Sequence, residues 1–139
     1  MNELYYASAT SLAKAIRAKE LSSQELIEAC LARIEVVNPQ LNALVQIAAE
    51  SARRQARAAD KALARGESIG PLHGVPFTIK DSLDTTGLIS TGGTTGRRFF
   101  IPARDATVVA RLRAAGGILL GKSNTPELTL SIETDNLIY

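Results

Sequence analysis

The residue best suited to take part in a reaction is Lys80, which ends a short run in which apolar residues alternate with other types. Val75, Phe77 and Ile79 are apolar and recur at every second position, as in a strand with one buried face. The alternation directs the Lys80 amine away from that apolar face. Lys80 also stands at the carboxyl end of the strand, where open α/β sheets place their ligand crevices. By residue type alone such a lysine is ordinarily solvated, so its meaning depends on its surroundings.

A second lysine, Lys122, lies in a segment that matches a nucleotide-binding pattern. Residues 116–123 read G-G-I-L-L-G-K-S, which satisfies the G-x-x-x-x-G-K-[ST] form of a phosphate-binding loop. In such a loop a turn separates the glycines and a helix begins at the lysine, whereas residues 118–120 are typical of a buried strand. Pro126 also interrupts any helix that would begin at Lys122. We therefore expect no nucleotide site here, which calorimetry with ATP or GTP would test.

Other residue types that perform chemistry are sparse. His73 is the only histidine and Cys30 the only cysteine, so neither a Ser-His-Asp triad nor a metal-ligand spacing can be traced. We expect no metal and no cofactor. Cys30 lies on an apolar helical stripe and is predicted to be packed core. Asp81 and Asp84 are predicted to be a loop cap and a supporting group for Lys80 rather than an acid–base pair.

The first half of the chain is predicted to be mainly helical. Ser22 and Glu25 form a capping box, and the apolar stripe that follows predicts a helix ending before Asn38-Pro39. Residues 42–47 are ambiguous between a short strand and a helix start. Two further helices are expected, one capped by Ser8 and one over residues 48–65 with Gly66 after its end.

The second half alternates strand, helix and strand. The expected elements are strands at 75–80 and 118–120, a helix at 105–115 capped by Asp105, a loop at 85–101, and a helix with Pro126 at its first position and Thr125 as its cap. A strand–helix–strand unit is nearly always right-handed, with its strands parallel. The chain is therefore predicted to be an α/β protein.

The amino-acid composition limits the class of protein to which the chain can belong. The 139 residues suffice for one compact domain, and 45% hydrophobic with 22% charged residues is typical of a soluble globular protein. The net charge of +2 is too small to indicate a nucleic-acid or anionic-membrane partner, and the arginine-rich stretch 48–65 is interleaved with acidic residues. A single cysteine fits a reducing cytoplasm. The N-terminal M-N-E-L-Y-Y has no features of an export signal, and no apolar run is long enough for a membrane span.

Several segments, in order, resemble blocks of one enzyme family. Residues 71–81 read P-L-H-G-V-P-F-T-I-K-D, and residues 121–127 read G-K-S-N-T-P-E. Between them, residues 105–116 are similar to a family helix, and residues 133–139 are similar to the lead-in to a serine loop. Together they resemble the amidase signature family of serine hydrolases, of which this chain would cover the N-terminal part only.

The resemblance implies a fold and a division of the chain. The fold is α/β, with N-terminal helices packed around the start of a mixed, largely parallel sheet, an incomplete amidase-signature fold. Residues 1–139 would be the N-terminal portion of a single amidase domain. Within it, residues 1–69 would form a helical layer, and residues 70–139 the βαβ portion that bears Lys80.

The resemblance also implies a mechanism. Family members hydrolyse amides through a Ser–cis-Ser–Lys triad, and Lys80 matches the lysine. Both serines belong to family segments expected beyond Tyr139, so the 139-residue chain alone is expected to be inactive. Residues 92–96, G-G-T-T-G, imitate the serine loop but match the family's glycine-rich loop after the lysine strand. Thr129 and Ser131 are expected to line the acyl pocket, although a surface helix fits them equally well.

Alternatives stay open at this stage. The substrate is expected to be a small-molecule amide, in a cytoplasmic enzyme without nucleic-acid or membrane partners. A homodimer is one open alternative for its oligomeric state. Within the family, the catalytic subunit of a glutamyl-tRNA amidotransferase is an alternative. Outside it, the chain could be a non-catalytic binding module.

Overall fold

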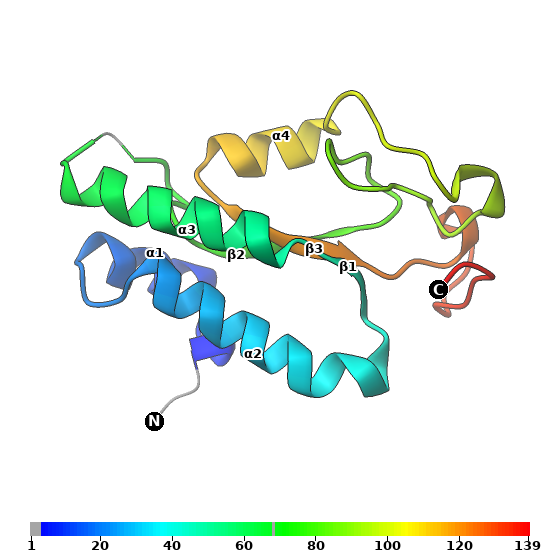
Figure 1. Ribbon diagram of the computed structural model, residues 1–139, viewed down its shortest axis with the longest axis horizontal. Helices are drawn as coiled ribbons and strands as arrows, with labels where there is room; N and C mark the ends of the chain where they lie inside the picture. Colours follow the sequence, from blue (N-terminus) through cyan, green and yellow to red (C-terminus); the bar gives the residue numbers. More distant parts are fainter. Residues whose placement is uncertain (1–3, 68) are drawn as a thin grey trace.

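The computed structural model describes residues 4–67 and 69–139. It contains four α-helices, three short 3₁₀ helices and three strands in the described residues. The strands form a sheet in the centre, with helices on both faces (Figure 1). Met1–Glu3, part of the N-terminal stretch predicted to lack an export signal, lie outside the described residues.

The N-terminal helices begin where their caps predict. Helix α1, Ala9–Arg17, begins after Ser8, whose side chain accepts a hydrogen bond from the amide of Ser11. Helix α2, Ser23–Leu41, begins with the complete capping box of Ser22 and Glu25. A short 3₁₀ helix, Leu4–Tyr6, precedes both.

The predicted end of α2 before Asn38-Pro39 is wrong. The helix runs through Pro39 to Leu41 and ends at Asn42, which adopts a left-handed conformation with φ 49°. Proline removes one intrahelical hydrogen bond, but the Asn38 side chain stabilises this turn from outside, because it both donates to and accepts from the backbone of Leu44. That same contact leads the chain into a strand, β1, Leu44–Ile47.

Helix α3, Ala49–Ala64, follows β1 directly and is succeeded by Gly66 at φ 70°, as predicted. Strand β2, Pro76–Lys80, and strand β3, Ile118–Ser123, flank helix α4, Thr107–Ala114. Strand β3 is longer than the predicted 118–120, since Gly121, Lys122 and Ser123 also pair with their neighbours.

Two predicted caps are wrong. Asp105 does not cap α4, whose N-cap is Ala106. Its carboxylate instead accepts from the amide of Thr86 and pairs with Arg113 at 3.3 Å. Pro126 is not the first residue of an α-helix; it is the N-cap of a 3₁₀ helix, Glu127–Thr129, with no side-chain cap. A left-handed Leu128 prevents a regular helix at this point.

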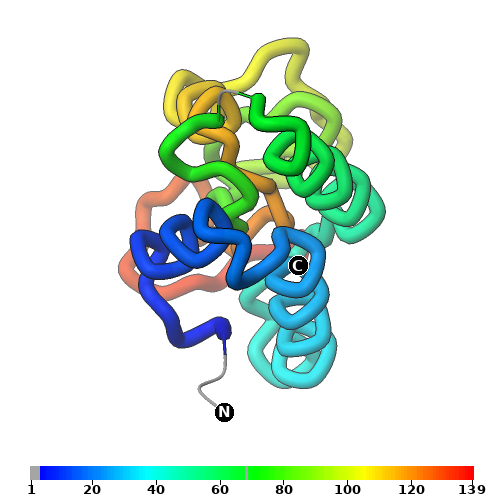
Figure 2. Tube along the Cα trace, turned by 90° about the vertical axis from the view of Figure 1, so that its left-hand side faces the viewer, coloured from blue at the N-terminus to red at the C-terminus, as the bar shows by residue number. Residues whose placement is uncertain are grey.

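The sheet has the order β1-β3-β2 and is mixed. Strand β2 runs parallel to β3, and β1 runs antiparallel to it. Helices α2 and α3 cover one face and α4 covers the other, which the turned view also shows (Figure 2). The contacts below α2 and α3 are made by Ile118 and Leu120, and those below α4 by Leu119 and Ile79. Helix α1 packs its Leu12 and Ile16 against α2 and the residue before β2. The α/β class and the mixed sheet are thereby confirmed.

Candidate functional site

Lys80 is the last residue of β2, and its side chain lies on the face opposite the buried Ile79. Because β2 and β3 are parallel, their carboxyl ends meet at one edge, where Lys80 is paired with Ser123. The edge beyond the carboxyl ends of parallel strands is the usual ligand site of open α/β sheets. The alternating pattern of the strand thus places Lys80 at this edge.

Lys80 is partly buried, and its amine makes no hydrogen bond or ion pair with any residue that the structure describes. The main chain around it is held firmly: the Lys80 carbonyl accepts from the amide of Leu83 at 2.9 Å, and the Asp81 amide donates to Ser123 at 2.9 Å. A rigid backbone therefore presents an amine without a partner.

Lys122 has the opposite character, since its side chain is fully buried. Its Nζ donates to the Leu83 carbonyl at 2.6 Å, to Ser90 Oγ at 2.8 Å and to Thr85 Oγ1 at 3.2 Å. It also lies 3.8 Å from Asp81 Oδ1. Burial lowers the pKa of Lys122, and the neighbouring Asp81 carboxylate opposes that shift. An amine whose three donors are all occupied is not free to bind a substrate.

A β-bulge in β3 places the side chains of Lys80 and Lys122 on opposite faces of the sheet. Along β2 and β3, Phe77 pairs with Leu119 but the next residue, Thr78, pairs with Gly121, so Leu120 is an extra residue in β3. If pairing continued in register after Phe77 and Leu119, Lys80 would be opposite Lys122, and both side chains would lie on one face. The one-residue shift turns Lys122 to the α4 face and leaves Lys80 opposite Ser123.

On the other side of β3, strand β1 packs closely against Gly121. A Cβ atom on Gly121 would lie 2.1 Å from the carbonyl oxygen of Gln46 and 3.2 Å from the Cα of Ile47. No other amino acid fits between the two backbones without moving one of them. Position 121 therefore requires a glycine for the approach of β1.

Asp81 is the centre of the buried polar network, and its side chain is fully buried. Its carboxylate accepts hydrogen bonds from both the amide and the hydroxyl of Thr91, and from the hydroxyl of Tyr139 at 3.3 Å. Gln46 of β1 donates to it at 3.3 Å. Burial raises the pKa of the Tyr139 hydroxyl, which favours the protonated form that donates this hydrogen bond. The Asp81 carboxylate makes no hydrogen bond or ion pair with the Lys80 amine among the described residues, because successive strand-end residues point to opposite faces. The predicted role of Asp81 and Asp84 as a loop cap and a supporting group for Lys80 stays a prediction.

Asp84 and the glycine-rich loop lie close to this network. Asp84 forms an ion pair with Arg97 at 2.5 Å, which ties the start of the loop to the 3₁₀ helix Thr95–Arg97. The amide of Gly92 donates to the Asp81 carbonyl at 3.3 Å. The loop is thus adjacent to the residue that follows Lys80, as expected for residues 92–96.

Thr129 and Ser131, the predicted pocket residues, are both exposed. Thr129 belongs to the 3₁₀ helix Glu127–Thr129, which is anchored to the glycine-rich loop by the hydrogen bond from the Leu128 amide to Gly92 at 2.7 Å. The Ser131 hydroxyl accepts from the amide of Glu133 at 3.2 Å. Their role in substrate binding stays a prediction.

The remaining candidates are structural. His73 Nε2 lies 3.0 Å from the Ala59 carbonyl, and Cys30 packs partly buried against the core, where burial raises the pKa of its thiol. Residues 116–123, which match the phosphate-loop pattern, follow α4, and residues 118–123 of this stretch form β3. No group of three or more His, Cys, Asp or Glu side chains within residues 4–67 and 69–139 is placed to hold a metal ion.

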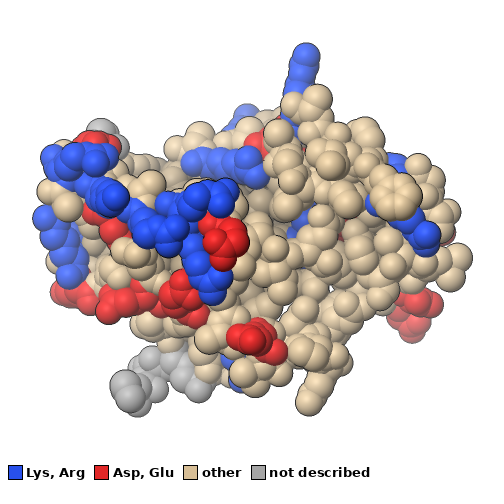
Figure 3. All heavy atoms as spheres, in the orientation of Figure 1, with Lys and Arg blue, Asp and Glu red and all other residues tan. Residues whose placement is uncertain are grey.

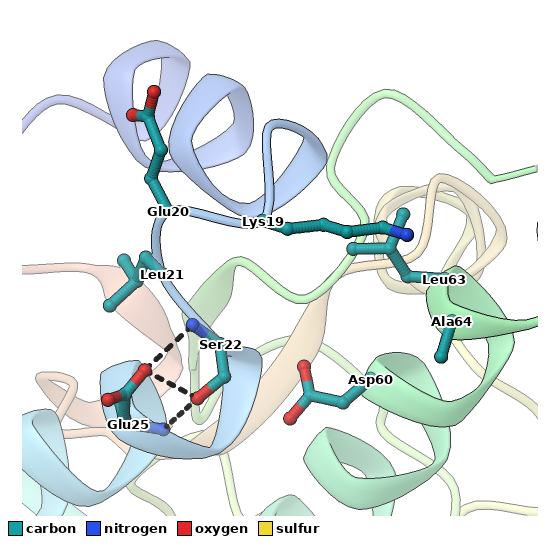
Figure 4. Close-up of a pocket in the computed structure, with 8 residues that line it drawn as sticks. All are labelled: Lys19, Glu20, Leu21, Ser22, Glu25, Asp60, Leu63 and Ala64. Atoms are coloured by element: carbon teal, nitrogen blue, oxygen red, sulfur yellow. Dashed lines mark hydrogen bonds between the residues drawn. The ribbon is translucent and has the colours of Figure 1, made fainter.

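A pocket of about 400 Å³ lies away from Lys80, where α1 leads into α2 (Figure 4). Its polar wall is Ser22 with Glu25, and Asp60 of α3 faces it. The first amides of α2 are already occupied, because Glu25 accepts from Ser22 and Asp60 accepts from Ser23 and Gln24. Three carboxylates, those of Glu20, Glu25 and Asp60, line the pocket beside the single amine of Lys19, so the lining does not favour an anionic ligand. We interpret this pocket as the junction of the helices.

Basic side chains gather over α3 on the face shown in Figure 3, with acidic ones along their border. Arg53 pairs with Glu28 at 2.8 Å and with Glu50 at 3.1 Å, and Arg65 pairs with Glu67 at 2.5 Å. This is the arrangement of a solvated, ion-paired helix face. No helix in the described part of the chain is long and apolar enough to cross a bilayer.

Comparison with known proteins defines the family. Residues 25–139 match the Amidase family. The chain is 44% identical over 136 residues to an acylamidase from Rhodococcus erythropolis, covering 98% of this chain and 28% of that protein. It is 42% identical over 139 residues to a glutamyl-tRNA(Gln) amidotransferase subunit from Chloroflexus aggregans, covering 100% of this chain and 28% of that protein.

Solved structures of related proteins support the same family assignment. A bacterial aryl acylamidase of the amidase signature family superposes with a TM-score of 0.88 at 30% identity, over 94% of this chain and 28% of that one. The chain therefore belongs to the amidase signature family of hydrolases, which confirms the resemblance of its motifs. It spans little more than a quarter of the length of these relatives.

Proposed function

We propose that this chain is the lysine-bearing part of an amide hydrolase, and that Lys80 is its general base. The supporting observation is the contrast between the two lysines at the strand ends. Lys80 is in the family's lysine motif and its amine has no partner among the described residues, whereas the Lys122 amine is saturated by hydrogen bonds. Of these two lysines, only Lys80 has an amine available for proton transfer.

In the proposed reaction, the neutral Lys80 amine takes a proton from the bridging serine, which in turn deprotonates the nucleophilic serine. The serine oxygen attacks the amide carbonyl, and the leaving nitrogen takes a proton and departs as ammonia or an amine. Water then hydrolyses the acyl-enzyme and restores the serine. Backbone amides stabilise the negative charge of the tetrahedral intermediates. In this proposal, both serines come from family segments outside these 139 residues.

The proposed substrate is a small amide. Its acyl part would lie beyond the carboxyl ends of β2 and β3, near the exposed Thr129 and Ser131. The acylamidase and aryl acylamidase relatives favour this class of substrate.

The test is Lys80→Ala in the complete gene product, assayed on a panel of simple aliphatic and aryl amides. Loss of a general base typically lowers kcat by about 10²–10⁴-fold, and we expect a loss in this range. Lys61→Met, at an exposed position of α3, is the matched lysine control and is expected to retain activity. Turnover near that of the unmodified enzyme in Lys80→Ala would refute the assignment.

A second candidate is a subunit of an amidotransferase, favoured by the similarity to the Chloroflexus aggregans protein over the whole chain. Such a protein would hydrolyse glutamine and pass the ammonia to a misacylated tRNA within a multiprotein complex. Comparing glutamine with simple amides, with and without purified partner proteins, separates the two candidates. An unmodified gene product that turns over neither would favour the non-catalytic module.

A further inference from the structure

The side chain of Lys122 contacts the backbone turn that follows Lys80, on the face of the sheet opposite the Lys80 side chain. Between Lys80 and Leu83 the chain reverses, closed by the hydrogen bond from the Leu83 amide to the Lys80 carbonyl at 2.9 Å. The Lys122 Nζ donates to the Leu83 carbonyl at 2.6 Å and lies 3.8 Å from the Asp81 carboxylate. One buried cation therefore contacts the turn at two residues.

Asp81 connects the same turn to its surroundings. Thr91 joins it to the glycine-rich loop, Gln46 joins it to β1, and Tyr139 joins it to the C-terminal segment. The direction in which β2 presents the Lys80 side chain is thus coupled to one carboxylate and one ammonium on the opposite face of the sheet.

We infer that Asp81 and Lys122 form a positioning pair, which sets the orientation of the Lys80 amine without contacting substrate. The inference rests on the proposed function of Lys80. The bulge at Leu120 is what permits this arrangement, since it directs Lys122 behind the turn instead of beside the amine of Lys80. Neither side chain of the pair is accessible to a substrate, because both are fully buried.

A positioning role differs from a purely stabilising one in how variants behave. Removing one partner leaves an unpaired buried charge and destabilises the fold strongly, whereas neutralising both removes that penalty. The double variant Asp81→Asn with Lys122→Met keeps the size of both side chains. It removes both charges and the hydrogen bond from Lys122 to the Leu83 carbonyl, but it leaves no unpaired buried charge. A loss of kcat in the folded double variant would therefore report on the orientation of Lys80 and not on folding.

The experiment measures kcat and KM of this double variant in the complete gene product, well below its unfolding temperature. We expect a folded protein with KM within about threefold of the unmodified value and kcat lower by about 10²-fold, the effect of misplacing a reacting group by about 1 Å. Lys61→Met is the matched control. A folded double variant with unmodified kcat would overturn the inference.

A second measurement asks whether the pair acts through Lys80. Adding the double variant to Lys80→Ala is expected to lower the residual kcat no further, because groups that act as a unit are not additive. A further 10²-fold loss, additive with that of Lys80→Ala, would assign the pair a separate role and overturn the inference. If Lys80→Ala alone retained activity, the proposed function would fail, whatever the pair did.

Should the double variant not fold, Ser90→Ala replaces it. This variant removes one of the three acceptors of Lys122 and keeps the ion pair. We expect kcat to fall by about fivefold with unchanged KM, as for the loss of one hydrogen bond. An unchanged kcat in Ser90→Ala would overturn the inference.

Discussion

Replacement of Gly121 by alanine is expected to separate β1 from β3. The new Cβ would lie 2.1 Å from the carbonyl oxygen of Gln46, far inside van der Waals contact, and the obstructing atom belongs to backbone. A flexible side chain could move aside, but here a strand must shift. Since Gln46 also donates to Asp81 and to the Ile89 carbonyl, the displacement would reach the network behind Lys80.

The magnitude follows from what the shift disrupts. Overpacking a well-packed site costs about 1–3 kcal/mol, and each net backbone hydrogen bond contributes about 1 kcal/mol. Two bonds at 2.8 Å flank the clash, from the Ala48 amide to Leu120 and from the Asn124 amide to Ala43. We therefore expect Gly121→Ala to lower the free energy of unfolding by about 3–5 kcal/mol.

The assay is urea unfolding of the complete gene product, with hydrogen exchange of peptides that contain Ala48 and Asn124 as a local readout. Gly96→Ala is the matched control, because a Cβ there meets nothing within 4 Å, and its unfolding is expected to be nearly unchanged. A Gly121→Ala protein as stable as the control, with the same exchange rates, would refute the account of the close approach between β1 and Gly121.

Three further outcomes are expected. Ser23→Ala should leave the free energy of unfolding unchanged or raise it by up to about 1 kcal/mol, since the Ser23 hydroxyl is buried without a hydrogen-bond partner among the described residues; a clear loss in a urea titration would contradict this. Stability should fall as pH drops below the ordinary pKa values of Glu25 and Asp60, which are 4.5 and 3.8. Burial acts to raise the pKa of Asp60, but hydrogen bonds from backbone amides at the start of α2 hold the pKa values of both carboxyl groups lower in the folded state. Melting temperatures from pH 7 to 3 measure this effect, and a flat profile would argue against it. Asn42→Ala should cost about 1 kcal/mol because alanine is strained at φ 49°, and Asn42→Gly should cost less; equal melting temperatures for the two would count against the strain.

Local sequence signals predicted much of the framework. The capping box at Ser22 and the cap at Ser8 set helix starts, because a side chain satisfies amides within the next three residues. Alternation over residues 75–80 placed Lys80 at a strand end on the polar face. The prediction failed where a contact reaches beyond the next turn: the Asn38 side chain bonds to the backbone of Leu44, six residues later, and α2 continues through Pro39.

The site behind Lys80 was not visible in the sequence. Lys122 stood out only through a phosphate-loop pattern and a family-like segment at residues 121–127, and nothing in the sequence linked it to Asp81. The one available signal was the glycine directly before Lys122, which marks a close backbone approach or a bulge in a strand. This glycine does not show which strand approaches it, nor that the register of β2 against β3 shifts by one residue.

The sequence by itself therefore determined the family, the order of the elements and the strand that ends on Lys80, because each depends on residues adjacent along the chain. Only the tertiary structure decided that Lys122 and Asp81 lie together on the opposite face. That decision depends on the register of β2 against β3, which a single extra residue at Leu120 shifts. Since side chains alternate with a period of two, one residue of register exchanges the faces of everything that follows it.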